Sequence, residues 1–382
     1  MDLTGGLFGW LVVMLTVGAF AAVVVFWPKV ASTGPLRIAA RVGMLLGVNL
    51  LVVLTAAVQL NDQFLFYAGW EDLAGAINGT TTTSSLHSGT DARRALEATP
   101  TGPAATAAAR SVTPLPPGGH IEDGASSYTV SGKLSGVTTT VIVTVPPGYD
   151  PADAATTYPV LETFSGYPGS VSQWVRTMRL RQQLTTQVSA HTMGRAIVVS
   201  PQLEVPAGVD TECVDGPSGT AQMETFLTRD VPQWVSEHFH VRAGRDAWAT
   251  IGLSAGGWCA AMAAMLHPAQ YGGAIIMGGY FHPEFSGGYD PFPPNSAMGR
   301  RYDLLALVRS APPPLAIWIE TSHADPVSYA STSTLLKIAK PPLSVEDVVL
   351  QNAGHRISVW QDQLPKALKW LGRSLPGFAP VR

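Results

Sequence analysis

Two long apolar stretches set the first 60 residues apart from the rest of the chain. Residues 7–27 contain no charged side chain, and residues 42–60 are interrupted only by three uncharged polar residues, Asn49, Thr55 and Gln59. At 1.5 Å per helical residue, such runs are long enough to cross a hydrocarbon layer of about 30 Å. The pattern therefore predicts two transmembrane helices within residues 1–60, at about 7–27 and 42–60.

The charges around these runs predict an orientation. The connector carries only basic charge, from Lys29, Arg37 and Arg41, whereas acids lie beyond the outer ends of both runs. By the positive-inside rule the connector is cytoplasmic, and both chain ends lie on the extracytoplasmic side of a cell membrane. Two alternatives stay open: the first run is a cleaved signal peptide, or either run is a buried core helix.

Beyond residue 60 the pattern changes twice. Residues 61–124 are predicted to be a juxtamembrane segment followed by a flexible linker, because the chain from Gly75 to about Gly124 is rich in Thr, Ala, Ser, Pro and Gly. Over residues 125–382 short apolar runs alternate with helical stretches, which predicts an α/β domain whose mostly parallel sheet is flanked by helices. The predicted strands are 127–134, 138–145, 160–164, 196–200, 247–251, 274–277, 315–320 and 345–350. The predicted helices are 172–190, 221–238, 256–266, 300–310, 327–339 and 358–373.

Composition narrows the classes of function. Only 13% of the 382 residues are charged, and 24 basic and 27 acidic side chains give a net charge of −3. No basic excess is available for nucleic acid, and a chain that is 46% hydrophobic is not disordered overall. The charge deficit is concentrated in the apolar runs and the linker, which favours a membrane-anchored protein.

One five-residue motif carries the strongest chemical signal. Gly252-Leu253-Ser254-Ala255-Gly256 follows a predicted strand and begins a helix rich in Ala and Met. G-x-S-x-G in that setting is typical of a nucleophile elbow, which presents the Ser254 hydroxyl at the carboxyl edge of the sheet. The N–H of Ala255, at the helix N-terminus, is then directed at a developing oxyanion. The alternative is an ordinary glycine-rich turn.

A serine nucleophile needs a base and an acid, which in such folds follow it in the order acid, then histidine. His355 lies between the last predicted strand and the final helix, so it is the predicted base. Asp325, in the loop after strand 315–320, is the predicted acid that orients His355. Glu320, at the end of that strand, is the alternative acid.

Further residues complete the predicted site. The loop at 165–170 follows strand 160–164, and the N–H of Tyr167 is the predicted second oxyanion donor. Cys213 and Cys259 are the only cysteines, and in an exported domain they predict one disulfide between an active-site loop and the nucleophile helix. Two unpaired thiols are the alternative. The pair His238 and His240 lacks a third ligand, and no nucleotide or phosphate motif occurs, so no metal or cofactor is expected.

From about residue 128 to 371 the sequence resembles the putative-esterase family of α/β-hydrolases. The pieces that carry the resemblance are VPPGYD, YPVLETFSGYPGS, DTECVDGPSG, TRDVPQWV, GLSAGGWCA and AGHRISVW. This family includes esterase D-like enzymes and the antigen 85 mycolyltransferases, and the chain is most similar to membrane-anchored actinobacterial members. The resemblance implies an α/β-hydrolase fold and a cell-envelope location. It also implies the roles of Ser254, His355, Tyr167 and Ala255.

Three functions are compatible with these features. The first is a tethered serine esterase that hydrolyses carboxylic esters through an acyl-enzyme. The second is an acyltransferase that moves an acyl chain to a sugar or lipid hydroxyl, with an acyl-lipid or glycolipid as substrate. The third is a catalytically inactive surface binding module. The aromatic stretch 278–295 is either the rim of an acceptor groove or a flexible surface loop, and the sequence does not predict an oligomeric state.

Overall fold

The computed structural model describes residues 3–78, 84–87, 92–100, 105, 112–122, 124–286 and 288–381. The chain divides into two compact units. The first comprises Met1–Thr83 with two short later segments, His323–Asp325 and Gln351–Val359. The second comprises the remaining residues.

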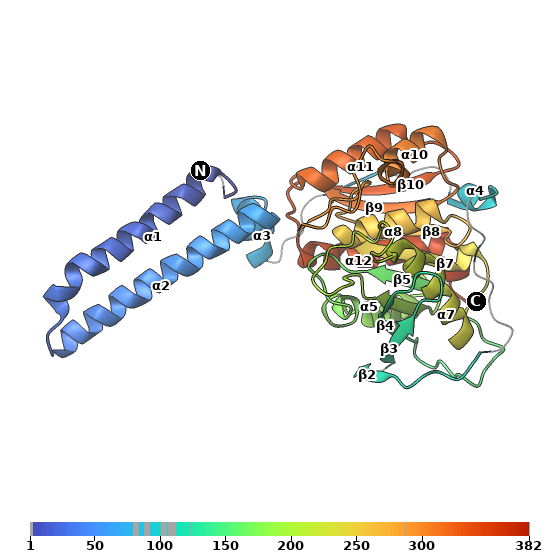
Figure 1. Ribbon diagram of the computed structural model, residues 1–382, viewed down its shortest axis with the longest axis horizontal. Helices are drawn as coiled ribbons and strands as arrows, with labels where there is room; N and C mark the ends of the chain where they lie inside the picture. Colours follow the sequence, from blue (N-terminus) through green and yellow to red (C-terminus); the bar gives the residue numbers. More distant parts are fainter. Residues whose placement is uncertain are drawn as a thin grey trace. The chain divides into compact units, whose positions relative to one another are not determined.

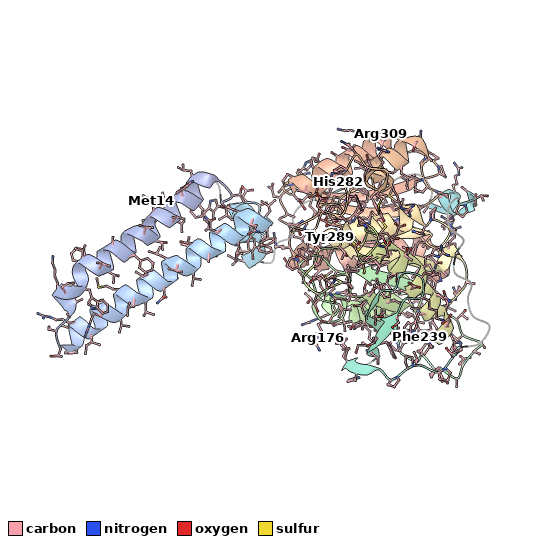
Figure 2. The ribbon with its side chains drawn as sticks, in the orientation of Figure 1. Met14, Arg176, Phe239, His282, Tyr289 and Arg309 are labelled. Atoms are coloured by element: carbon pink, nitrogen blue, oxygen red, sulfur yellow. A yellow bond between two sulfur atoms is a disulfide. The ribbon has the colours of Figure 1, made fainter. Side chains whose placement is uncertain are left out.

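The first unit is built on two apolar antiparallel helices, α1 (Gly6–Phe26) and α2 (Pro35–Phe64), joined through the short turn η1 (Trp27–Val30). Helix α2 begins earlier than the predicted run because Pro35 starts it and Arg37 and Arg41 occupy its first turns. Most side chains of both helices are exposed, including Met14 in Figure 2. Both helices are long and apolar enough to cross a membrane, with mean hydropathies of 2.4 and 2.1.

Polar contacts join the two helices. The hydroxyls of Thr16 and Thr55 lie 2.8 Å apart, so one donates to the other. Each hydroxyl also lies within 2.9 Å of a carbonyl oxygen one turn earlier in its own helix. Helix α3 (Trp70–Asn78) follows α2, and Trp70 makes an edge-to-face contact with Phe8 at the start of α1. Thr55, one of the polar residues that interrupt the second apolar run, therefore contributes to the contact between the two helices.

In the described residues, the second unit is built on one ten-stranded sheet in the order β1-β10-β9-β8-β7-β5-β6-β4-β3-β2; Figure 1 shows this sheet between its helices. The strands from β10 to β6 in this order are parallel, and the others are antiparallel to their neighbours. The strands are β1 (Ser84–His87), β2 (Gly119–Glu122), β3 (Ala125–Ser131), β4 (Thr138–Thr144), β5 (Val160–Phe164), β6 (Ile197–Pro201), β7 (Trp248–Leu253), β8 (Gly273–Met277), β9 (Ala316–Ser322) and β10 (Ser344–Leu350). The predicted strands are all present, within a few residues of their predicted ends.

Helices separate the parallel strands along the chain, as predicted, and others lie between β1 and β2 and after β10. They are α4 (Ala92–Glu97), η2 (Gln173–Thr177), α5 (Leu180–Ser189), α6 (Met223–Thr225), η3 (Phe226–Asp230), α7 (Val231–His238), η4 (Arg245–Ala247), α8 (Ala255–Leu266), α9 (Ala297–Arg301), α10 (Leu304–Ser310), α11 (Pro326–Ile338), α12 (Ile357–Ser374) and η5 (Pro376–Phe378). Alternate sheet residues such as Ile317 and Ile319 join one core cluster, and the intervening Trp318 is buried too. Both faces of the sheet are therefore covered, as buried parallel strands require.

The segment predicted as a linker contributes to the second unit where the structure describes it. Strand β1 pairs with β10, and β2 pairs with β3, so this segment supplies both end strands of the sheet. Helix α4 buries Ala95, and the carbonyl of Leu96 accepts a hydrogen bond from Arg245. Other parts of the predicted linker lie outside the described residues.

Candidate active site

Ser254 is the residue that connects β7 to α8, and its backbone conformation is strained. Its φ and ψ are 56° and −128°, a region that a non-glycine residue enters at a cost of about 1–3 kcal/mol. The conformation is held by the N–H of Ser254, which donates to the carbonyl of Met277 on β8 over 2.9 Å. Strand, strained serine and helix follow one another as a nucleophile elbow requires.

The two glycines of the motif are required by close backbone approach. A Cβ on Gly252 would lie 1.8 Å from the carbonyl oxygen of Gly256. A Cβ on Gly256 would lie 2.2 Å from the carbonyl oxygen of Phe164, the last residue of β5. No side chain fits at either position, so the elbow packs directly on the end of the neighbouring strand.

The loop after β5 lies beside Ser254. A Cβ built on Gly166 would be 3.3 Å from that of Ser254. The N–H groups of Gly166 and Gly169 are taken by Gln173 and Glu204, at 3.1 and 2.8 Å. Among the described residues no acceptor is recorded for the N–H of Tyr167, and Ala255 is the first residue of α8, whose N–H has no intrahelical partner. Both predicted oxyanion donors therefore carry N–H groups suited to an anion.

The predicted disulfide is present. Cys213 and Cys259 are bonded, with their Cα atoms 5.7 Å apart. The indole of Trp258 also donates to the carbonyl of Glu212 over 2.8 Å. These two links fasten the loop after β6 to the first turns of the nucleophile helix.

Buried acids in this loop were not predicted from the sequence. Glu212 accepts a hydrogen bond from Tyr280 at 2.6 Å, and Asp210 accepts one from Ser286 at 2.7 Å. Burial raises the pKa of both carboxyl groups above their ordinary values. Both residues line a small cavity of about 20 Å³ together with Tyr167 and Ala255. Their polar sequence, VDTECVD, carried no signal that they would be buried.

The aromatic stretch 278–295 is packed onto the core through several of its rings, and its role as the rim of an acceptor groove stays a prediction. Its rings Tyr280, Phe281 and Phe292 are buried in the core, and Phe292 stacks on Tyr302. The side chain of His282, labelled in Figure 2, is 56% exposed. The described part of this segment is therefore anchored by its aromatic residues.

His355 and Asp325 come together in the first unit. Nδ1 of His355 lies 2.7 Å from Oδ2 of Asp325. Asp325 follows β9 by three residues and His355 follows β10 by five, so each is on the loop at the carboxyl end of its strand. Glu320, the alternative acid, lies inside β9, where its carbonyl accepts the N–H of Gly278. Asp325 thus lies within hydrogen-bond distance of Nδ1 of His355, the position from which an acid orients an imidazole.

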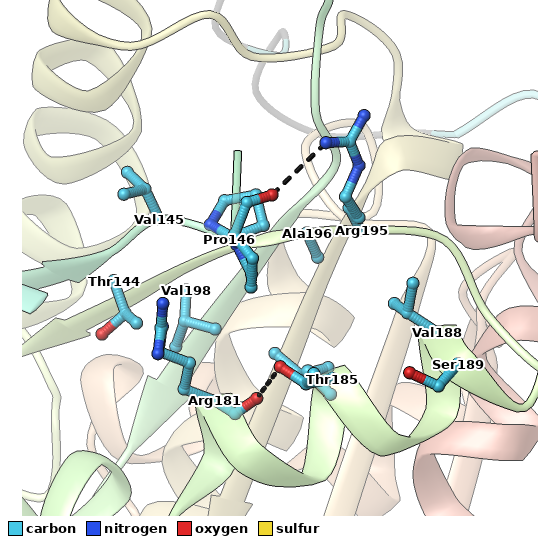
Figure 3. A pocket seen from close by; sticks show the side chains of 12 residues that line it. Thr144, Val145, Pro146, Arg181, Thr185, Val188, Ser189, Arg195, Ala196 and Val198 are labelled. Atoms are coloured by element: carbon cyan, nitrogen blue, oxygen red, sulfur yellow. Dashed lines mark hydrogen bonds between the residues drawn. The ribbon is translucent and has the colours of Figure 1, made fainter. Parts of the chain in front are cut away.

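A larger cavity lies where β6 begins, at the opposite end of the parallel strands from the elbow, which follows the last residue of β7. It has a volume of about 240 Å³ and is enclosed by α5, the end of β4 and the start of β6 (Figure 3). Two of its lining residues are joined by a hydrogen bond, from the Arg195 guanidinium to the carbonyl of Pro147 at 3.3 Å. Its walls are mainly apolar, and no residue of the predicted site lines it. Among the described residues, no group of three or more His, Cys, Asp or Glu side chains is arranged to hold a metal ion.

Comparison with known proteins decides the family. A family model described as "Putative esterase" matches residues 132–371, more than half of the chain. The chain belongs to this esterase family. The predicted family resemblance is thereby confirmed.

Two curated relatives match part of the chain. An uncharacterised protein of Corynebacterium glutamicum is 30% identical over 118 residues, which cover 31% of this chain and 27% of the relative. The diacylglycerol acyltransferase/mycolyltransferase Ag85B of Mycolicibacterium smegmatis is 37% identical over 94 residues, which cover 25% of this chain and 26% of the relative. The chain thus spans about a quarter of the length of each of these relatives.

Solved structures confirm the fold. A ferulic acid esterase superposes with a TM-score of 0.55 at 17% identity, covering 65% of this chain and 97% of that one. An S-formylglutathione hydrolase from Agrobacterium tumefaciens superposes with a TM-score of 0.54 at 17% identity, covering 67% and 98%. The second unit therefore has the predicted α/β-hydrolase fold.

Proposed function

We propose that this member of the esterase family is a membrane-tethered serine esterase that hydrolyses carboxylic esters through an acyl-enzyme on Ser254. One observation carries the proposal: a strained serine follows β7, while a hydrogen-bonded His355–Asp325 pair follows β9 and β10. Parallel strands end at one edge of a sheet, so the three loops that supply a triad start from the same edge.

The chemistry follows from these groups. Oγ of Ser254 attacks the acyl carbon while Nε2 of His355 takes its proton, and the oxyanion is bound by the N–H groups of Tyr167 and Ala255. Collapse of this intermediate breaks the ester bond, and the leaving alkoxide receives the proton from His355. Water, deprotonated by the same imidazole, then attacks the acyl-enzyme and releases the carboxylic acid and free Ser254.

Acyl transfer is the second candidate, supported by the local similarity to Ag85B. In that reaction a sugar or lipid hydroxyl replaces water in the second step, and the acyl group passes to the acceptor. An inactive surface binding module is the least supported candidate, because the strained elbow and the His355–Asp325 pair are both retained.

The membrane placement is also part of the proposal. Helices α1 and α2 span the bilayer, and the basic connector between them is cytoplasmic. The catalytic unit then lies on the extracytoplasmic side, where a disulfide such as Cys213–Cys259 persists. Protease treatment of intact cells tests this placement, because the esterase unit must be degraded before the cells are lysed.

The activity is tested on the full chain in detergent micelles. A fluorophosphonate probe and p-nitrophenyl esters are compared on the wild type, Ser254→Ala and Ser310→Ala, which changes an exposed serine at the end of α10. Labelling and turnover are expected for the wild type and Ser310→Ala, and neither for Ser254→Ala. A wild type that neither labels nor turns over would exclude both enzyme functions. Faster turnover with added sugar or glycerol, together with an acylated acceptor, would favour transfer over hydrolysis.

A further inference from the structure

The loop that carries His355 is held by the segment that follows helix α2. This segment, residues 65–72, is called the post-helix segment below. The N–H of His355 itself donates to the carbonyl of Leu65 over 2.8 Å. Leu65 directly follows the last residue of α2, so the backbone of the predicted base is hydrogen-bonded to the chain where it leaves the second apolar helix.

Asp72 holds the residues on both sides of His355. Its two carboxylate oxygens accept a bidentate pair of bonds from the Arg356 guanidinium, at 2.6 and 2.7 Å. Oδ2 also accepts the N–H of Gly354 at 2.9 Å. Three consecutive residues of the loop, 354–356, are thus fixed by the post-helix segment. Asp72 is buried, so these charge-assisted bonds are shielded from water.

Arg356 has partners beyond Asp72. It donates to the carbonyl of Phe66 at 3.0 Å and to the hydroxyl of Ser358 at 3.1 Å. Its guanidinium also lies over the ring of Tyr67, 4.9 Å from the centroid. The guanidinium is therefore oriented from several sides, and loss of Asp72 would leave a largely buried positive charge without its counter-ion.

The fit between the two backbones is close at Gly354. A Cβ at this position would lie 2.2 Å from the carbonyl oxygen of Phe66. Only glycine can occupy the position while the post-helix segment is in place. The glycine immediately before the predicted base thus allows the close contact between the loop and the post-helix segment.

The post-helix segment is also shaped by its own contacts. Leu65 adopts a left-handed conformation, with φ of 51°, and turns the chain out of α2. The side chain of Asn61 then bonds both backbone groups of Tyr67, at 2.7 and 3.0 Å. Asp72 accepts the N–H of Ala68 at 3.0 Å. These bonds fix the backbone conformation of the post-helix segment, to which the loop carrying His355 is hydrogen-bonded.

We propose that the post-helix segment is part of the catalytic apparatus and that Asp72 is a positioning residue for His355, acting through Arg356 and the N–H of Gly354. This inference rests on the proposed function, because it takes His355 as the base. It goes beyond that function by making catalysis depend on a residue outside the esterase fold. The esterase unit is then incomplete without the end of α2.

The test uses the full chain in micelles, with Asp72→Asn compared with Glu71→Gln. Glu71 is the exposed neighbour of Asp72, so its variant is a matched control for a lost acid in the same helix. Turnover is expressed per site labelled to completion with the fluorophosphonate, which removes any effect of unfolded protein. For Asp72→Asn we expect kcat and the labelling rate to fall 10–100-fold with KM within twofold, and for Glu71→Gln we expect no change. Asp72→Glu, which retains a carboxylate, should recover part of the loss.

A second measurement is independent of activity. Hydrogen exchange of residues 351–359 is followed in the same proteins, and protection of this loop should fall in Asp72→Asn alone. An unchanged kcat per labelled site, unchanged exchange, or an equal loss in Glu71→Gln would each overturn the inference. If the wild type were inactive, the proposed function would fail, and the exchange result would still decide whether Asp72 holds the loop.

Discussion

Nδ1 of His355 lies 2.7 Å from Oδ2 of Asp325. The imidazole is 25% exposed, whereas the carboxyl side chain is only 9% exposed. A buried acid at Nδ1 fixes the proton on that nitrogen and leaves Nε2 to exchange protons with a reacting group. The pair is therefore arranged for catalysis by His355, with the acid at Nδ1 and the base function at Nε2.

The first prediction concerns the choice of acid. Asp325→Asn should lower kcat by about 10³–10⁴-fold with little change in KM, because an amide no longer favours the productive tautomer or stabilises the imidazolium. Glu320→Gln should have a much smaller effect on turnover per labelled site. Steady-state kinetics of both variants check this, and a larger loss in Glu320→Gln would reverse the assignment.

The second prediction concerns the disulfide. Cys213 and Cys259 are 46 residues apart, so loss of the bond should lower the free energy of unfolding by about 4 kcal/mol in the chain-entropy model. Thermal unfolding of the wild type with and without dithiothreitol measures the change. A variant with both cysteines replaced by alanine serves as the control, because reductant should leave its midpoint unchanged.

A third prediction concerns stability in acid. Burial alone would raise the pKa of Glu224, but hydrogen bonds from His267, Arg301 and Tyr302 lower it to about 2. Since the unfolded-state pKa is 4.5, the ionised carboxylate stabilises the fold by about 3 kcal/mol above pH 4.5. That contribution is lost as the pH falls from about 4.5 to 2. Denaturant unfolding across this range should show a weaker pH dependence for Glu224→Gln, and an unaltered slope would contradict the assignment.

A fourth prediction concerns Glu162, whose raised pKa makes stability fall, not rise, with increasing pH. Complete burial raises the pKa of Glu162 to about 8, although Tyr271 donates a hydrogen bond to it at 2.7 Å. The carboxyl is therefore neutral in the folded protein while it ionises near 4.5 in the unfolded chain. Stability should fall by up to about 1.4 kcal/mol per pH unit from this group as the pH rises from 4.5 to 8. Glu162→Gln should flatten this decline in unfolding experiments at pH 5–8, and a decline of the same steepness would rule out Glu162 as its source.

Local sequence patterns predicted much of the fold and the places in it of several candidate site residues. The strands alternate with helices where the apolar runs do, and the setting of Ser254 follows from its flanking strand and helix. The position of His355 was predictable because it closes the last strand–helix connection. These features depend on residues within a few positions of one another, which a single sequence records.

The remaining features depend on distant partners. Asp72 and Arg356 are 284 residues apart, and nothing in the pattern near either one indicates the other. Strand β1 lies in a segment of linker-like composition, yet it pairs with β10 through backbone groups, which any side chain allows. The burial of Glu212 likewise depends on Tyr280 and Trp258, which belong to other parts of the chain.

The two end strands have a practical consequence for handling this protein. An open sheet edge presents unpaired N–H and C=O groups to other chains, and short end strands are one way in which proteins limit such pairing. Here β1 is four residues long and covers the seven-residue β10. A shortened chain that begins after residue 87 would uncover β10 and invite strand exchange between molecules. Shortened versions intended to stay monomeric should therefore begin before Ser84.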